Sequence, residues 1–221
     1  MGRQDNMQPA EVSSTKLTYD DYLLFPDDGR RHELIDGEHH VTPAPSLRHQ
    51  RILRRLTTAF DVFLQTHRLG EVFCAPVDVV PTDVDVVEPD VLFVSNERAA
   101  ILRDPVRGAP DLVIEILSPS SRRTDEIVKR KLYERIGVRE YWVVDPELDA
   151  VKVYRRDGEK FARGGEFSRE EGHSLSTPLL PGLSIPLGLR RHGKLTHLCS
   201  LESDHVRNTI TISVGPSSLG G

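Results

Sequence analysis

The chain has 221 residues, of which 38% are hydrophobic, and carries a formal net charge of −5. This length and composition predict one domain with a hydrophobic core, and the charge argues against a strongly basic protein that coats nucleic acid. Cys74 and Cys199 lie far apart, so neither a disulfide framework nor a zinc knuckle is indicated. No apolar run reaches the roughly 20 residues of a membrane helix, and the polar N-terminus lacks a signal-peptide core. We therefore expect a cytoplasmic protein with no membrane association.

The first 42 residues predict a leader, a short helix and a hairpin. Residues 1–16 are polar, and we expect them to form a flexible leader. In residues 17–25, Thr18 precedes acidic and then apolar residues, which is the pattern of a capped helix start. In residues 31–42, the pair Asp36-Gly37 separates two short runs and predicts the turn of a hairpin.

The middle of the chain predicts one long helix followed by strands. Apolar residues recur at steps of three and four over 47–69, which indicates a helix, and Gly70 is its predicted C-cap. Two strands are predicted at 71–81 and 85–95. A third strand is predicted at 111–117, where the sequence is DLVIEIL.

A second helix is predicted over 124–136, because a helical pattern there is closed by Gly137. Two more strands are predicted at 139–145 and 150–156. Residues 177–189 are apolar and interrupted by proline, which favours an extended closing segment.

The last part of the chain differs from the rest. Residues 191–221 show no clear periodicity, and we expect a disordered tail. The predicted domain therefore covers 17–190. Three strands precede the second helix, an order that predicts an α/β domain with a central mixed sheet flanked by helices.

An acidic residue interrupts the third predicted strand. Glu115 stands between Ile114 and Ile116, where a buried carboxylate costs on the order of several kcal/mol unless it is paired, hydrogen-bonded or bound to a metal. Asp90 leads into the preceding apolar run and is a second carboxylate on an adjacent strand. Two such groups make a hard-oxygen site suited to Mg²⁺ or Mn²⁺. Such an ion polarises a phosphate and lowers the pKa of bound water.

The residue pattern alone leaves structural roles open for each of these groups. The buried glutamate could be a hydrogen-bond partner, Asp90 could shape a strand entrance, and Asp111 could cap the start of its strand. Lys129 and Lys131 could reach back and stabilise charge on a phosphate, or they could form a solvated helix face. His49, at the start of the first helix, could be a cap, a packing residue or a base.

Basic residues gather on both predicted helices and could neutralise a nucleic-acid backbone. Helix arginines are also usually solvent-facing, so this signal is weak. The candidates for phosphate contact are Arg48 and Arg51 on the first helix and Arg122 and Arg123 at the start of the second.

The order of these motifs resembles the Uma2 family of restriction endonucleases, also called DUF820, in the PD-(D/E)XK nuclease superfamily. The resemblance covers roughly residues 17–189. It rests on the segments RHELIDGE, SLRHQRIL, VVEPDVLFV, PDLVIEILSPSSR and KRKLYERIGVREYWVVDP. It implies a restriction-endonuclease-like fold with one helix on each face of the sheet. It also implies an endonuclease that uses Mg²⁺ or Mn²⁺ and acts on DNA, in a superfamily where homodimers are common.

The resemblance assigns roles to four acidic or basic side chains. Pro89-Asp90 matches the Pro-Asp of the superfamily and Glu115 its second acid, which makes both metal ligands and catalytic residues. Glu33 matches an additional upstream acid of the family. His49 matches a histidine typical of the family at the start of the first helix.

Two departures from the plain motif affect the assignment. The lysine expected two residues after the second acid is replaced by Leu117, so the resemblance takes the lysine from the following helix, as Lys129 with Lys131 as the second choice. A second Pro-Asp pair ends at Asp111, four residues before Glu115. The two Cα atoms would then lie about 13 Å apart on one strand, too far for one metal ion to bridge easily, so Asp90 is the expected ligand.

Two other functions are compatible with the same residues. A catalytically inactive nuclease-like fold would bind nucleic acid, or serve as an assembly module, without metal dependence. A metal-dependent hydrolase of small phosphate esters would act on nucleotides and not on polymers. The complete set of two acids and a lysine favours the catalytic reading over the inactive one.

Overall fold

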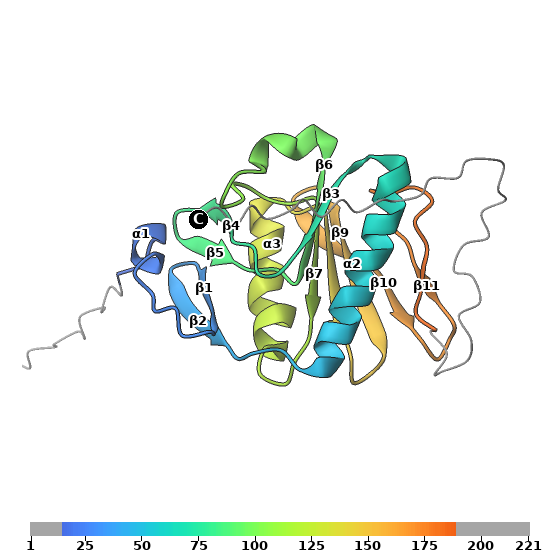
Figure 1. The fold of residues 1–221 in the computed structure, drawn as a ribbon, viewed down its shortest axis with the longest axis horizontal. Helices are drawn as coiled ribbons and strands as arrows, with labels where there is room; N and C mark the ends of the chain where they lie inside the picture. The colour runs from blue at the N-terminus through green and yellow to red at the C-terminus, as the bar shows by residue number, and fades with distance from the viewer. Residues whose placement is uncertain (1–14, 189–221) are drawn as a thin grey trace, which may run out of the picture. The chain divides into compact units, whose positions relative to one another are not determined.

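The computed structural model describes residues 15–188 (Figure 1). The predicted tail, 191–221, and all but the last two residues of the predicted leader, 1–16, lie outside the described residues. Over residues 15–188, no helix has the length and apolar character needed to cross a membrane. The described chain forms strands and helices in mixed order, as the sequence predicts.

The larger of two main sheets forms the centre of the fold. Its strands lie in the spatial order β10 (Lys160–Ser168), β9 (Ala150–Asp157), β8 (Glu140–Asp145), β7 (Leu112–Ile116), β6 (Val91–Ser95) and β3 (Gly70–Cys74). Strands β7 and β8 are parallel, whereas the other neighbouring pairs are antiparallel. The prediction of a central mixed sheet is confirmed.

A smaller sheet stands beside the larger one. Its strands lie in the order β2 (Glu38–Thr42), β1 (Arg31–Ile35), β5 (Asp85–Val87) and β4 (Val79–Thr82). The β1–β2 hairpin is confirmed, with Asp36 and Gly37 at positive φ in its turn, as a tight hairpin turn requires. The short helix α1 (Tyr19–Tyr22) is also confirmed, with a capping box between Thr18 and Asp21.

The strands predicted at 71–81 and 85–95 are each divided between the two sheets. The first becomes β3 and β4, and the second becomes β5 and β6. Pro76 and Pro89 lie at the two breaks, where a residue without an N–H cannot continue a ladder. The prediction of two uninterrupted strands is therefore wrong. The second break places Asp90 in the short connection directly before β6.

Helix α2 (Leu47–His67) covers one face of the larger sheet (Figure 1). Its buried apolar residues pack on Leu112, Ile114 and Ile116 of β7. These helix residues are Leu53, Leu56, Phe60 and Leu64. The predicted C-cap is wrong, because the left-handed residue is Arg68. Gly70 instead begins β3, where a Cβ would lie 2.2 Å from the carbonyl oxygen of Val94.

The second predicted helix is confirmed on the opposite face. It consists of a π-helical turn, η2 (Thr124–Lys129), followed by α3 (Arg130–Ile136) and left-handed Gly137. The sequence pattern did not predict the π turn. Leu132 packs with Val113 of β7. Alternate residues of β7 therefore face different helices, and Glu115 shares the α3 face with Val113.

Four further elements complete the described chain. The 3-10 helix η1 (Asn96–Ile101) and strand β10 were not predicted, although β10 forms a long hairpin with β9. A short pair, β11 (Ser174–Leu175) and β12 (Ile185–Pro186), lies around and within the predicted closing segment. Leu180 and Leu183 of that segment are buried against the α2 side of the core.

Candidate active site

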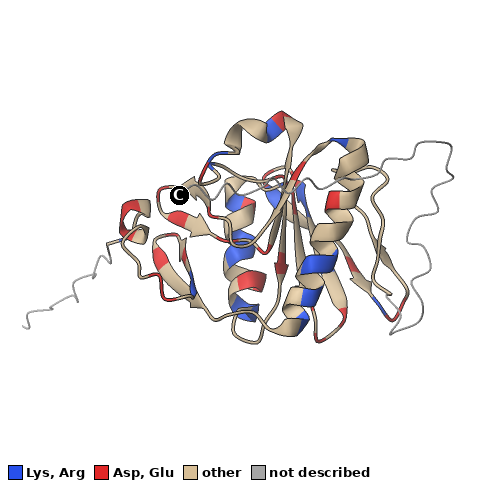
Figure 2. Cartoon of the chain, in the orientation of Figure 1, with Lys and Arg blue, Asp and Glu red and all other residues tan. Residues whose placement is uncertain are grey.

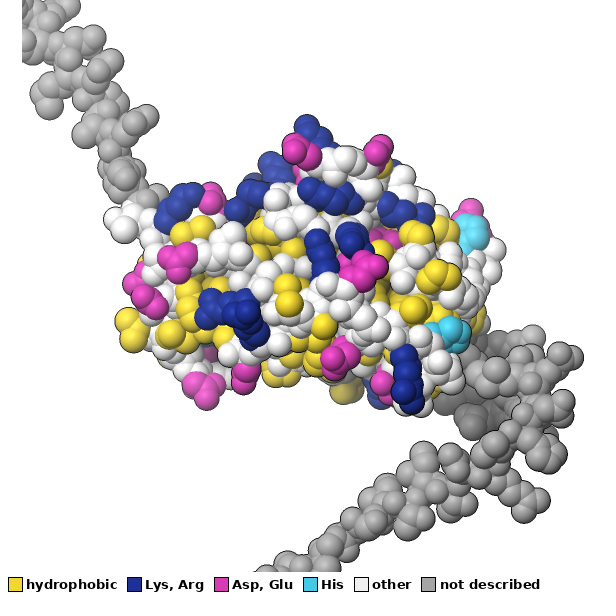
Figure 3. All heavy atoms as spheres, turned by 90° about the horizontal axis from the view of Figure 1, so that it is seen from above, with side chains coloured by type: hydrophobic (Ala, Val, Ile, Leu, Met, Phe, Trp, Pro, Cys, Tyr) yellow, Lys and Arg dark blue, Asp and Glu magenta, His cyan; other side chains and the backbone are white. Residues whose placement is uncertain are grey.

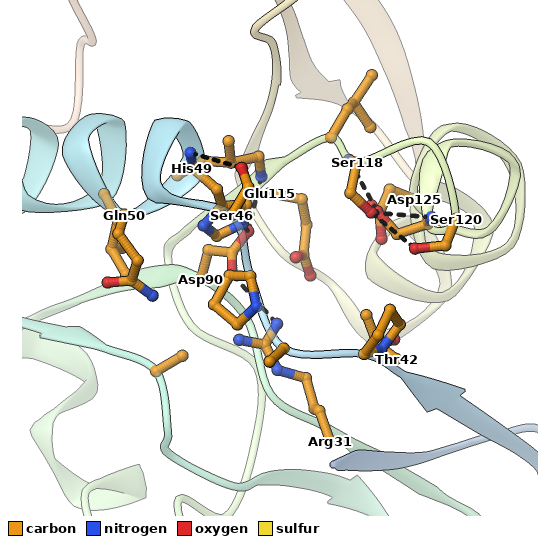
Figure 4. Close-up of a pocket in the computed structure, with 18 of the residues that line it drawn as sticks. Arg31, Thr42, Ser46, His49, Gln50, Asp90, Glu115, Ser118, Ser120 and Asp125 are labelled. Atoms are coloured by element: carbon orange, nitrogen blue, oxygen red, sulfur yellow. Dashed lines mark hydrogen bonds and ion pairs between the residues drawn. The ribbon is translucent and has the colours of Figure 1, made fainter. Parts of the chain in front are cut away.

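A pocket of about 750 Å³ lies where the smaller sheet, the start of α2 and the end of β7 meet (Figure 4). Its lining includes acidic and basic side chains from five parts of the chain that are distant in sequence. They include Arg31, His49, Glu88, Asp90, Glu115, Asp125 and Lys129, and the neutral Thr42 also lines the pocket.

Strand β1 directs two charged side chains toward the site. Arg31 and Glu33 lie two residues apart, so they leave the strand on the same face. Arg31 contacts Asp90, and Glu33 contacts Lys129. Leu34, the residue after Glu33, faces the other way, into a small apolar cluster beneath α1. Alternation along β1 therefore places Arg31 and Glu33 on the face toward the site and Leu34 on the opposite face.

Asp90 is held by three groups from different elements. Its Oδ1 lies 3.1 Å from Nη1 of Arg31, and its Oδ2 lies 3.1 Å from Nε2 of His49 and accepts the backbone N–H of Ile116 at 2.7 Å. Ile116 directly follows Glu115, so this last bond fixes Asp90 beside the second acid. Burial alone would raise the pKa of Asp90, but the His49 hydrogen bond and the Arg31 charge together lower it below its usual value. Asp90 is therefore ionised at neutral pH.

His49 reaches Asp90 because it sits in the first turn of α2. The hydroxyl of the N-cap residue Ser46 accepts the backbone N–H of His49 at 3.2 Å. Since Asp90 accepts, Nε2 of His49 donates in this contact. The other ring nitrogen, Nδ1, is buried and has no hydrogen-bond partner within residues 15–188. The arrangement makes His49 an orienting group for Asp90, with no ring nitrogen turned to pocket water.

Lys129 is buried among carboxylates. Its Nζ lies 2.8 Å from Oε1 of Glu33, 3.0 Å from Oε1 of Glu115 and 3.6 Å from Oδ1 of Asp125. Burial alone would lower the pKa of Lys129, but these neighbours raise it well above its usual value, so the amine stays charged. The contact with Asp125 is longer than a hydrogen bond. One N–H of Lys129 therefore remains for a water molecule or a ligand in the pocket.

Glu115 is 1% exposed and its two oxygens differ. Oε1 accepts the hydroxyl of Tyr133 at 2.7 Å and the amine of Lys129 at 3.0 Å. Oε2 has no hydrogen bond from the described part of the chain, and the carboxylate points into the pocket in Figure 4. Burial raises the pKa of Glu115 to about 8. A cation beside Oε2 would oppose this rise and favour the ionised form of Glu115.

The helix after β7 supplies three site residues from one face. Asp125, Lys129 and Tyr133 follow one another at intervals of four residues, which places them on one side of a helix. All three are buried, and the first two lie within the π-helical turn. Single π turns occur frequently at functional sites.

Of the catalytic residues expected from the sequence, the structure brings together Glu33, Asp90, Glu115 and Lys129, with His49 alongside. The second-choice Lys131 is exposed and has no ion pair among residues 15–188. Asp111 lies at the opposite end of β7 and does not line the pocket. Its Oδ2 accepts the backbone N–H of Ser95 at 2.7 Å, which is a structural role.

The arginines expected to contact phosphate are in different situations. Arg122 forms a fork with Asp145 at 2.6 and 3.2 Å, and Arg48 lies 3.1 Å from Asp149. Both line the pocket. The other two, Arg51 and Arg123, are exposed outside it. Figure 2 shows basic positions repeated along α2, and Figure 3 shows further Lys and Arg on the η1 side of the molecule. Basic charge alone therefore does not locate a ligand.

Sequence reasoning missed Arg31, Asp125 and Tyr133. A signal was present for each of them. Arg31 stands two residues before Glu33 in a predicted strand, and the other two stand four residues on either side of Lys129 in a predicted helix.

The donor set can be compared with what a divalent cation requires. Within the described chain, no group of three or more His, Cys, Asp or Glu residues is placed to hold a metal ion. Mg²⁺ typically binds through one or two carboxylates, and water and substrate oxygens complete its shell. Asp90 and Glu115 provide two carboxylates at one pocket, with Oε2 of Glu115 open. This set fits Mg²⁺ or Mn²⁺ and does not fit a closed structural zinc site.

Comparisons with known proteins give one family model and two solved structures. A family model described as "Uma2: Putative restriction endonuclease" matches residues 19–188. The crystal structure of "a putative nuclease belonging to DUF820" from Anabaena variabilis matches with a TM-score of 0.65 and 23% identity, over 77% of this chain and 95% of that chain. The type IIG restriction endonuclease BpuSI matches with a TM-score of 0.36 and 12% identity, over 58% of this chain and 15% of that chain. Comparison with curated proteins gives no match.

Proposed function

Because the chain belongs to the Uma2 family, as its motifs led us to expect, we propose that it is a metal-dependent endonuclease that hydrolyses phosphodiester bonds in DNA. The observation that carries the proposal is the meeting of two carboxylates and a lysine at one pocket. Asp90 is tied to the backbone beside Glu115, and Lys129 is bonded to Glu115 itself. Two acids and a cation are the groups that phosphodiester hydrolysis with a metal ion requires.

Asp90 and Glu115 are the residues that would hold Mg²⁺ or Mn²⁺. When bound, the ion supplies Lewis acidity at the phosphate and makes the attacking water more acidic. The protein prepares these ligands in advance. Arg31 and His49 keep Asp90 ionised and fix its orientation from opposite sides, which is how neighbouring hydrogen bonds tune a metal ligand.

Lys129 acts on the same centre from the α3 side. Its charge is secured by the carboxylates around it, and its remaining N–H can orient a water molecule or stabilise charge that develops on the phosphate. Glu33 holds Lys129 in place, because its Oε1 contacts the amine and also accepts the backbone N–H of Glu88 at 2.9 Å. Glu33 therefore assists as a positioning residue.

Contact with nucleic acid is assigned to Arg48 and Arg122, which line the pocket, and to Arg51 and Arg123, which are exposed outside it. Arg48 and Arg122 must exchange an acidic partner for a phosphate, whereas Arg51 and Arg123 are free to contact one without such an exchange. Because these contacts are electrostatic, DNA binding is expected to weaken steeply with salt.

Cleavage of supercoiled plasmid with Mg²⁺ or Mn²⁺ tests the proposal. The wild type is expected to nick or linearise the plasmid only when a metal ion is present. Glu115→Gln, Asp90→Asn and Lys129→Met are expected to lower the rate by about 100-fold or more. Lys131→Met is the matched control, because it removes the same side chain from an exposed position of the same helix. Metal-dependent cutting by Glu115→Gln at the wild-type rate would overturn the proposed mechanism.

A further inference from the structure

Arg31 has a hydrogen-bonding edge that the protein does not use. Its Nη1 donates to Oδ1 of Asp90 at 3.1 Å, and its Nε lies 3.6 Å from Oε2 of Glu88. Its Nη2 has no partner in the described part of the chain. The side chain is 19% exposed and extends into the pocket toward Asp90 in Figure 4. The guanidinium therefore presents a free donor next to a proposed metal ligand.

The other Lys and Arg side chains that line the pocket are paired with acidic side chains, and two of them lie at its rim. Lys129 is only 3% exposed and faces three carboxylates. Arg122 forms its fork with Asp145. The remaining two are exposed rim residues that each face an aspartate, namely Arg30 with Asp28 and Arg48 with Asp149.

Thr42 provides a second donor beside Arg31. The two residues are directly opposite in the β1–β2 ladder, so their side chains leave the sheet on the same face. Thr42 lines the pocket, and its hydroxyl makes no hydrogen bond to residues 15–188. A planar guanidinium and a hydroxyl on the same face of the hairpin are both donors that suit the oxygens of a phosphate group.

The ligand must be an anion that can approach an acidic floor. Asp90 and Glu115 line the pocket and are each at most 2% exposed, so a phosphate that approaches them needs a cation beside them. Arg31 lines the same pocket, contacts Asp90 and is 19% exposed, so it is more accessible than these acids. A guanidinium there offsets the repulsion from the floor and gives a phosphodiester a fixed position.

We propose that Arg31, assisted by Thr42, binds a backbone phosphodiester of the substrate through Nη2 while Nη1 continues to hold Asp90. This inference deepens the proposed function and rests on it, because it gives the catalytic pocket its phosphodiester ligand. Arg31 then links the position of the substrate to the position of the acid that holds the metal ion.

The test uses the full-length protein without metal ions, in EDTA. The probes are the dinucleoside monophosphate dTpdT and its uncharged methylphosphonate analogue, each titrated by NMR. The wild type is expected to prefer the charged probe by about tenfold or more, the factor that one charge-assisted hydrogen bond provides. Arg31→Gln is expected to lose this preference. Arg30→Gln is the matched control, since it removes the adjacent arginine at the pocket rim, and it is expected to keep the preference.

A second measurement follows the Arg31 side chain itself in the wild-type protein. The charged probe is expected to shift the Nε–H signal of Arg31, which is assigned by its absence in Arg31→Lys, and the neutral analogue is expected to leave it unchanged. A residue that served only to hold Asp90 would show no such difference between the probes.

The outcomes separate this inference from the proposed function. If the Arg31 signal does not respond to the charged probe, or if Arg31→Gln keeps the wild-type preference, the inference is overturned even when plasmid is cut. If the preference depends on Arg31 but the wild type never cuts plasmid with Mg²⁺ or Mn²⁺, the phosphodiester site stands and the nuclease proposal fails.

Discussion

Replacing Lys129 with methionine tests how the buried charges of the site are balanced. Methionine keeps most of the length of the side chain and removes its charge. Glu33, Glu115 and Asp125 would then share a buried site without the amine that now lies 2.8 to 3.6 Å from each of them. Removing one partner of a buried ion pair costs about 3–5 kcal/mol, because it leaves uncompensated charge.

The loss of stability caused by Lys129→Met is expected to grow as the pH rises. Burial already raises the pKa of Glu115 to about 8 and raises the pKa of Asp125. Without Lys129 these values rise further. The folded state then binds more protons than the unfolded state above about pH 4, where unfolded carboxyls titrate. The variant must therefore lose stability as the pH rises from 5 to 8.5.

Urea denaturation, followed by the fluorescence of the buried Trp142, measures this cost. Lys129→Met is expected to lower the free energy of unfolding by about 3–5 kcal/mol at pH 8.5 and by clearly less at pH 5. Lys131→Met, its exposed control, is expected to stay within about 0.5 kcal/mol of the wild type at both values. Equal effects of the two variants, or a larger penalty at pH 5 than at pH 8.5, would refute this account of the charges.

Three further predictions follow from single contacts. His49→Gln is expected to weaken Mg²⁺ binding by about 10- to 100-fold in calorimetry, because it loosens Asp90; unchanged affinity would exclude the orienting role. Burial alone would raise the pKa of Asp145, but its fork with Arg122 and its backbone bonds lower it. These contacts stabilise the folded state above about pH 4, and the stabilisation is lost as the pH falls through the folded pKa of Asp145. Arg122→Gln should therefore move the midpoint of acid unfolding to higher pH, and an unchanged midpoint would contradict this. Gly70→Ala should cost at least about 2 kcal/mol in urea denaturation, since its Cβ would meet the carbonyl oxygen of Val94, and a neutral result would disprove the close approach.

The parts of the site that lie on regular elements follow from local patterns in the sequence. A period of two places Glu115 on the face of β7 opposite to Ile114 and Ile116, and the structure has it so. Helical spacing relates Lys129 to Tyr133, and both contact Glu115. The upstream acid Glu33 came only from the family resemblance. Glu33 nevertheless lies in a predicted strand. The alternation of side chains along that strand places Arg31 on the same face as Glu33, so it would have indicated Arg31 as a further site residue.

Other features depend on contacts between distant residues, which local patterns do not contain. The division of each predicted strand between two sheets results from long-range pairing, such as Leu34 of β1 with Val86 of β5. The fork between Arg122 and Asp145 joins residues 23 positions apart. The local sequence does not show this pairing, so Arg122 was predicted to be free to contact a phosphate. The π turn that buries Asp125 also has no simple sequence signal.

The most direct test of the central claim is calorimetric titration of Mg²⁺ and Mn²⁺ into the wild type and into Glu115→Gln, each with a non-cleavable DNA duplex present. Mg²⁺ binding is typically completed by substrate phosphates, so the duplex belongs in the experiment. If Asp90 and Glu115 form the metal site, the wild type binds with a millimolar or better dissociation constant and the variant loses the heat of binding. Equal heats in the two proteins, or no binding by either, would contradict the claim and leave Glu115 as a structural partner of Lys129 and Tyr133.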